Sequence, residues 1–196
     1  MKNPSDMREI SGAEMDAFFY QAVNRDYTDS SKYTNVAYTR GHVFPNQYGV
    51  NQDQADSTFT FTNVAPQTQH SNGRWAEQVE IPMRKEILRE CKANDGKPTY
   101  IVTGVVPGTK WIPITRTERN KPKTFDRGIN IPNYYWTAFC CVKTDNIRFS
   151  KAYLALQNEP NDKTFELSEM SVNILNSQLT RLYKQDFSVF GGLCLT

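Results

Sequence analysis

The chain has 196 residues, of which 38% are hydrophobic and 22% are charged. This length supports one well-buried core and is short for two domains. The 23 basic and 21 acidic residues leave a formal net charge of +2, which permits an anionic partner without requiring one. No apolar run approaches the ~20 residues that a membrane-spanning helix needs, so the composition is typical of a globular protein without a membrane segment.

The N-terminal segment, residues 1–19, is polar and only weakly helical, and we expect it to lie on the surface. It lacks the apolar core of a signal peptide. We expect residues 20–196 to form a single domain. No repeat or low-complexity tract divides this part of the chain.

Two short strands are expected next. The first lies around YTRGH, Tyr38 to His42, and the second is TFTFT, Thr58 to Thr62, which alternates β-branched and aromatic residues. The following VAPQ is expected to end the second strand, and a loop should then lead to a helix.

That helix is predicted from apolar residues that recur at steps of four, namely Trp75, Val79, Met83, Ile87 and Cys91. Ser71 and Asn72 are the candidate N-caps. Pro82 removes a backbone donor from the helix interior, so we expect a kink or two abutting helices near Ile81. The part from Asn72 to Glu80 should be helical in either case.

Three strands are predicted further along, in TYIVTGVVPG, YYWTAFCCVK and KAYLALQN. Pro107 and Gly108 should stop the first of them, and the charged, proline-rich segment at 110–132 should be a long excursion from the sheet. A last helix is expected from about Ser168 to Tyr183. The irregular alternation of helices and strands indicates an α+β fold with a mixed or antiparallel sheet.

The four cysteines show no CxxC spacing, which argues against a zinc or redox motif. They are Cys91, Cys140, Cys141 and Cys194. Two disulfides and four free thiols are both compatible with this count. Adjacent Cys140 and Cys141 on a strand would point to opposite faces, so they cannot easily share a partner.

Polar residues suited to phosphodiester chemistry cluster around the first helix. Histidine suits proton abstraction from water near neutral pH, and arginine presents donors that match phosphate oxygens; His42 and Arg40 lie two residues apart. Asn72 and Glu80 are eight residues apart, a little over two helical turns, so they should share a helix face. One amide and one carboxylate suit Mg²⁺, which keeps most of its waters.

Five motifs in order resemble the DNA/RNA non-specific endonuclease family, in particular its vertebrate endonuclease domain-containing group. They are TRGH, TFTFTNVAPQ, SNGRWAEQVE, YIVTGVVPG and IPNYYWTAFCC. The resemblance implies an α+β fold with a ββα-metal (His-Me finger) core, lacking the first strands of the family. Most members read DRGH where this chain has Thr39.

The resemblance also implies a role for each site residue. His42 would be the general base, Asn72 the single direct ligand of Mg²⁺ or Mn²⁺, and Glu80 a group that holds water around the metal. Arg40 would clamp the phosphate, and Asn63 would lie beside the base and order the site. DNA and RNA would be cut with little sequence preference, leaving 5′-phosphates. Secretion and disulfides are implied too, with Cys194 tied to the sheet.

Less specific interpretations compete with these roles. Asn72 alone is most simply an N-cap, and His70 is expected to be a surface residue. A basic run could line a nucleic-acid groove or be a solvated loop; its members are Lys110, Arg116, Arg119, Lys121, Lys123 and Arg127. Trp75 should pack against the helix. The alternative function is an inactive nuclease fold that binds nucleic acid or protein.

Overall fold

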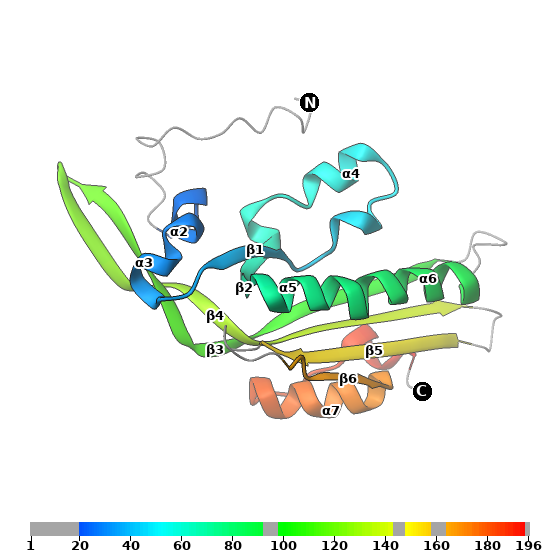
Figure 1. Ribbon diagram of the computed structural model, residues 1–196. Helices are drawn as coiled ribbons and strands as arrows, with labels where there is room; N and C mark the ends of the chain where they lie inside the picture. The colour runs from blue at the N-terminus through cyan, green and yellow to red at the C-terminus, as the bar shows by residue number, and fades with distance from the viewer. Residues whose placement is uncertain (1–19, 92–97, 143–147, 158–163, 195–196) are drawn as a thin grey trace. The chain divides into compact units, whose positions relative to one another are not determined.

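A computed structural model describes residues 20–91, 98–142, 148–157 and 164–194 of the chain (Figure 1). The expected polar segment at 1–19 therefore lies outside the described residues. The chain forms two compact units, each assembled from two separate segments. Unit 1 comprises the described residues up to Asn72 together with Pro107–Pro132, and unit 2 comprises Gly73–Val106 and the described residues from Asn133 onward.

Unit 1 contains short helices and a two-stranded sheet. The elements in chain order are α2 (Asn24–Thr28), α3 (Ser30–Thr34), β1 (Tyr38–His42), η2 (Asn46–Tyr48), α4 (Gln52–Ser57), η3 (Phe61–Asn63) and β2 (Val64–Thr68). Strands β1 and β2 are antiparallel, with Tyr38 opposite Thr68 and His42 opposite Val64. The expected strand at YTRGH is thus confirmed.

The second expected strand was misplaced. Thr58 ends helix α4, with its backbone N–H and its hydroxyl both bonded to the Ala55 carbonyl, and a 3₁₀ turn follows at 61–63. The strand β2 is VAPQT instead, the segment expected to end it. Among the described residues β2 pairs with β1 alone, so Pro66, which has no N–H, can lie in this strand without leaving a neighbouring strand unpaired.

A helical run follows β2 without the expected loop. It consists of α5 (Gln69–Trp75), the π-helical segment η4 (Ala76–Glu80) and α6 (Ile81–Glu90). The N-cap is Thr68, whose hydroxyl accepts from the Ser71 N–H at 3.1 Å, and neither Ser71 nor Asn72 serves as the cap. The discontinuity expected near Ile81 is the π-helical segment, which closes with an Ile81 N–H to Ala76 bond just before Pro82.

The main sheet has the order β3-β4-β5-β6. Its strands are β3 (Thr99–Glu118), β4 (Lys121–Val142), β5 (Arg148–Leu156) and β6 (Leu167–Met170), and the β4/β5 and β5/β6 pairs are antiparallel. The three strands expected here are confirmed. Together with the helices they give the α+β class that was expected.

The expected stop at Pro107-Gly108 and the excursion after it are wrong. Strand β3 continues to Glu118 and returns as β4 through a turn whose two residues, Arg119 and Asn120, both have positive φ. The Asn130 side chain accepts from the Gly108 N–H and donates to the Gly108 carbonyl, both at 2.9 Å. These bonds satisfy the backbone at the interruption, so the hairpin continues.

In unit 2 helices cover the two faces of the sheet. The tilted rings of Trp75 and Tyr135 pack with their centroids 6.1 Å apart, and the Thr137 hydroxyl lies 4.0 Å from the Met83 sulfur, which places the first helical run on one face. On the other face α7 (Val172–Tyr183) packs into a buried cluster of Val106, Trp136, Ala138, Ala152, Leu154, Val172, Leu175, Leu179 and Val189 (Figure 1). The buried Trp75 packs as expected.

Helix α7 begins later than predicted. The Ser171 hydroxyl accepts from the Ile174 N–H and caps the helix, so residues 168–170 belong to strand β6 instead. The 3₁₀ segment η5 (Val189–Gly192) follows α7. Among the residues that the structure describes, no helix is long and apolar enough to cross a membrane.

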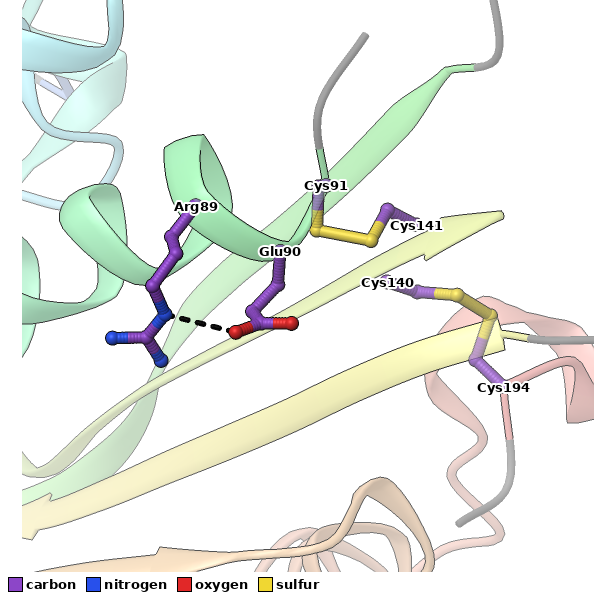
Figure 2. The surroundings of a disulfide bond; sticks show 6 residues. All are labelled: Arg89, Glu90, Cys91, Cys140, Cys141 and Cys194. Carbon is purple, nitrogen blue, oxygen red and sulfur yellow. Dashed lines mark hydrogen bonds and ion pairs between the residues drawn. A yellow bond between two sulfur atoms is a disulfide. The ribbon is translucent and has the colours of Figure 1, made fainter. Parts of the chain in front are cut away.

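All four cysteines form disulfides within unit 2. Figure 2 shows Cys91, at the end of α6, bonded to Cys141, and Cys140 bonded to Cys194. The adjacent cysteines of β4 therefore have different partners, as their opposite orientation predicted. The alternative of four free thiols is excluded, and Cys194 is tied to the sheet as the resemblance implied.

Candidate active site

His42 ends strand β1 and has an unsatisfied ring nitrogen. Its Nε2 atom is buried and has no hydrogen-bond partner among the described residues. The Phe59 ring packs edge-on against the imidazole with a centroid distance of 4.8 Å. Burial lowers the pKa of His42 below its ordinary 6.5, and the positive charge of Arg40 lowers it further. The imidazole is therefore neutral near pH 7 and can accept a proton.

Asn63 forms hydrogen bonds to the backbone directly after His42. Its side chain accepts from the Phe44 N–H at 2.9 Å and donates to the Phe44 carbonyl at 2.9 Å and to the Thr58 carbonyl at 2.8 Å. Its backbone carbonyl accepts from the Val43 N–H at 2.8 Å. These bonds hold the carboxamide against the backbone that follows His42.

Arg40 lies on the same strand, and its side chain is exposed. Its guanidinium donates a hydrogen bond to the Asn24 carboxamide at the start of α2. This bond uses one of the five N–H donors of a guanidinium, so others can bind an anion. Sequence reasoning missed Asn24, because nothing in the local pattern indicates that α2 lies against β1.

Gly41 separates Arg40 from His42 because the backbone is closely approached there. A Cβ at this position would overlap the Gln67 side-chain oxygen and lie 2.9 Å from the Gln67 Cβ. Gln67 is buried, and its backbone carbonyl accepts a 2.9 Å bond from the Thr39 hydroxyl. The glycine lets β1 and β2 pack closely, and Thr39 adds a cross-strand bond. Sequence reasoning did not identify Gln67.

Asn72 and Glu80 lie on the helical run, Asn72 in α5 and Glu80 in η4. The side chain of Asn72 is half-buried and has no hydrogen-bond partner within the described part of the chain. Since Thr68 is the cap, Asn72 is free of the capping role that competed with metal binding. Glu80 is half-buried and belongs to unit 2, whereas His42, Arg40, Asn63 and Asn72 belong to unit 1.

His70 differs from expectation. It is half-buried rather than on the surface, and its buried Nε2 has no hydrogen-bond partner among the described residues. It lies at the start of α5, where the expected loop is absent and the chain turns directly from strand to helix.

The donor chemistry of these residues fits one kind of metal. The residues described contain no group of three or more His, Cys, Asp or Glu side chains that could enclose an ion, as zinc would require. A single uncommitted amide oxygen suits Mg²⁺, which binds few protein oxygens and keeps several waters.

The chain matches a family model and two curated relatives in sequence. The family model described as DNA/RNA non-specific endonuclease matches residues 12–186. The "Endonuclease domain-containing 1 protein" of Homo sapiens and that of Mus musculus are each 33% identical over 122 residues, which is 62% of this chain and 20% of either relative. The chain thus spans about a fifth of the length of the curated relatives it matches.

A solved structure shows the same fold. A chain in the crystal structure of the EndoG/EndoGI complex superposes with a TM-score of 0.54 at 16% sequence identity, covering 94% of this chain and 69% of that one. This likeness agrees with the strand, strand, helix order of β1, β2 and α5 that carries the candidate residues. From the family match over residues 12–186, this chain belongs to the DNA/RNA non-specific endonuclease family.

Proposed function

We propose that this chain hydrolyses phosphodiester bonds in DNA and RNA with little sequence preference, using His42 as the general base and Mg²⁺ or Mn²⁺ as cofactor. The observation that carries the proposal is the buried, unpartnered Nε2 of His42 at the end of β1. Buried polar atoms nearly always have partners, so this orphaned nitrogen, two residues from the exposed guanidinium of Arg40 on the same strand, is available to accept a proton from a reactant. Membership of a nuclease family supports water and a phosphodiester as the reactants.

In this proposal His42 takes a proton from the attacking water. The water oxygen forms a bond to phosphorus, the bond from phosphorus to the 3′ oxygen breaks, and the product carries a 5′-phosphate. The lowered pKa of His42 keeps Nε2 unprotonated at neutral pH, which a base requires. The edge-on Phe59 ring and the Asn63 bonds to the next residues restrict the imidazole and its strand.

Arg40 binds the phosphate in this proposal. A guanidinium matches phosphate oxygens in geometry and offsets the negative charge that develops in the transition state. Asn24 holds the side chain through one donor and leaves the others for the substrate. Contacts limited to the backbone account for low sequence specificity.

Asn72 would hold the metal through its carboxamide oxygen, and Glu80 would hold surrounding water. Eight residues of regular α-helix turn roughly 80° beyond two full turns. The π-helical segment between them takes more residues per turn, which reduces this offset and favours a shared side of the run. When bound, Mg²⁺ supplies positive charge that stabilises the phosphate and the leaving 3′ oxygen.

The test is nicking of supercoiled plasmid DNA and cleavage of single-stranded RNA by purified protein with Mg²⁺, Mn²⁺ or EDTA. Replacing the base, as in His42→Ala, should lower the cleavage rate by roughly 10²- to 10⁴-fold. Asn72→Ala should lower the rate and raise the Mg²⁺ concentration needed for half-maximal cleavage. His70→Ala is the matched control, because His70 also has a buried, unpartnered Nε2 and should leave the rate near that of the wild type.

Two results would contradict the proposal. Folded wild-type protein that leaves both substrates intact with every metal would point to the inactive binding module instead. Equal loss in His42→Ala and His70→Ala would show that the imidazole of His42 has no special role.

A further inference from the structure

The end of the β3–β4 hairpin lies in unit 1 with His42 and carries exposed basic residues. Six basic residues were candidates for a groove, and the structure separates them. Arg116 is fully buried, and its guanidinium donates to both Asp26 carboxylate oxygens at 2.7 Å, so it cannot reach a ligand. Lys123 binds Glu118 at 2.7 Å and lies 5.1 Å over the Phe125 ring.

Three exposed cations on the hairpin have no ion-pair partner among the described residues: Arg119, Lys121 and Arg127. We call these three side chains the basic ribbon. The Glu118 carboxylate is already taken by Lys123, so Asp126 is the remaining acidic group beside them. The end of the hairpin therefore presents a local excess of positive charge to solvent, although the whole chain is almost neutral.

The turn and the strand arrange these charges in space. Positive φ at Arg119 and Asn120 gives a two-residue turn, which places Arg119 at the apex of the hairpin. Lys121 and Arg127 are six positions apart on β4, an even spacing, so they project from the same side of the strand. At ~3.3 Å per residue, six positions place these two side chains roughly 20 Å apart along the strand, so each cation can meet a separate phosphate.

The hairpin is fixed to the elements that carry the candidate site. Beyond the Arg116–Asp26 ion pair, Arg25 donates to the Thr115 carbonyl at 3.1 Å, and the hydroxyls of Tyr33 and Thr115 lie 3.3 Å apart. These bonds join β3 to α2 and α3. Helix α2 also supplies Asn24, which binds Arg40. One helix therefore positions both the basic ribbon and the proposed phosphate clamp.

We propose that the basic ribbon is a second contact surface for nucleic acid, which binds backbone phosphates away from the bond that is cut. The choice of nucleic acid as the polyanion rests on the proposed function. Phosphate neutralisation by exposed cations supplies most non-specific affinity, and it carries no sequence information. The ribbon would hold a strand while Arg40 and His42 act on one linkage.

The test measures binding without cleavage, in EDTA, with a fluorescent duplex DNA at several salt concentrations. The variant Arg119→Gln/Lys121→Gln/Arg127→Gln should lower the slope of log K against log[salt] by about 2 to 3, since each lost phosphate contact removes roughly 0.9. The control is Arg148→Gln/Arg181→Gln/Lys184→Gln, which removes two exposed arginines and one exposed lysine from unit 2. The control also matches the backbone conformation at one position, because Lys184, like Arg119, has a positive φ.

A charge-preserving variant, Arg119→Lys/Lys121→Arg/Arg127→Lys, should keep the wild-type slope. It shows whether a changed slope in the Gln variant comes from the lost charge or from damage to the hairpin. An unchanged slope in the Gln variant, or an equal loss in the control, would overturn the proposal. So would wild-type protein that binds no DNA at low salt. Because the assay needs no catalysis, binding through the ribbon without any cleavage would leave this inference standing and defeat the proposed function alone.

Discussion

At the scale of single residues, the RGH stretch could be recognised from the sequence, but the residues that contact it from other segments could not. Arg40, Gly41 and His42 are adjacent in the chain, so their chemistry can be read directly. Gln67, which requires a glycine at position 41, and Asn24, which binds Arg40, come from strand β2 and helix α2. Contacts between segments this far apart depend on the fold, and no local pattern indicates them.

A titration of His42 tests the electrostatics of the site. Burial and Arg40 both disfavour the protonated ring, so ¹H NMR of the metal-free protein should give a pKa below 6.5. In Arg40→Gln the positive charge beside His42 is removed while the ring stays buried. The pKa of His42 should therefore rise but remain below 6.5. Because the unfolded chain binds this proton more tightly, the neutral ring stabilises the fold above pH 6.5, and this contribution is lost as pH falls through the folded pKa.

The Arg84→Gln variant controls for the loss of an exposed cation that does not contribute to the lowered pKa of His42, and it should leave the His42 resonance where the wild type has it. A His42 pKa at or above 6.5 in the wild type would contradict the neutral base. The chain has only two histidines, so the signals can be assigned with His70→Ala.

At the scale of elements, strand and helix cores were predicted well and their ends poorly. The apolar periodicity from Trp75 to Cys91 located a helix correctly, because burial of one face dictates it. The errors at Thr58, Pro107 and Ser168 arose where side-chain hydrogen bonds determine whether a helix or strand ends or continues. The Thr58 hydroxyl, the Asn130 carboxamide and the Ser171 hydroxyl each satisfy backbone groups there, so helix and strand ends depend on partners that periodicity does not reveal.

The buried ion pair between α2 and β3 should matter greatly to stability. Asp26→Asn would leave the Arg116 charge buried without its counter-ion, at a cost of roughly 3 to 5 kcal/mol. Urea unfolding measures this loss. The exposed pair Lys32 to Asp29 is the comparison, and Lys32→Ala should leave the urea midpoint unchanged.

Replacing both partners, as in Asp26→Leu/Arg116→Met, should recover much of the stability, because no buried charge remains uncompensated. If Asp26→Asn unfolds at the wild-type urea concentration, the ion pair does not hold α2 against the hairpin.

At the scale of the whole molecule, the α+β class and the ββα order could be predicted, whereas the cysteine pairing could not. Orientation on the strand shows that Cys140 and Cys141 need different partners, but either could in principle bond Cys91. The choice depends on which helix covers which face of β4. Odd-numbered Tyr135 and Thr137 contact the helical run that ends at Cys91, and even-numbered Trp136 and Ala138 face α7.

The two disulfides should stabilise different parts of unit 2. They join residues 50 and 54 positions apart, so removing either should cost about 2 to 5 kcal/mol by urea unfolding. Hydrogen exchange distinguishes the effects of the two disulfides. Cys91→Ala/Cys141→Ala should increase exchange at the end of α6, and Cys140→Ala/Cys194→Ala should increase it in η5. The same exchange pattern in both variants would show that the two bonds act on one cooperative segment.

The adjacent cysteines also have a consequence for oxidative folding. Exchanging their partners would require β4 to slip by one residue, and such a slip moves every side chain of a strand to the opposite face. Trp136 would then point toward α6 and Tyr135 toward α7, which the packing of both layers opposes. The native bonds can therefore form only after β4 has found its register, and once formed they lock that register covalently.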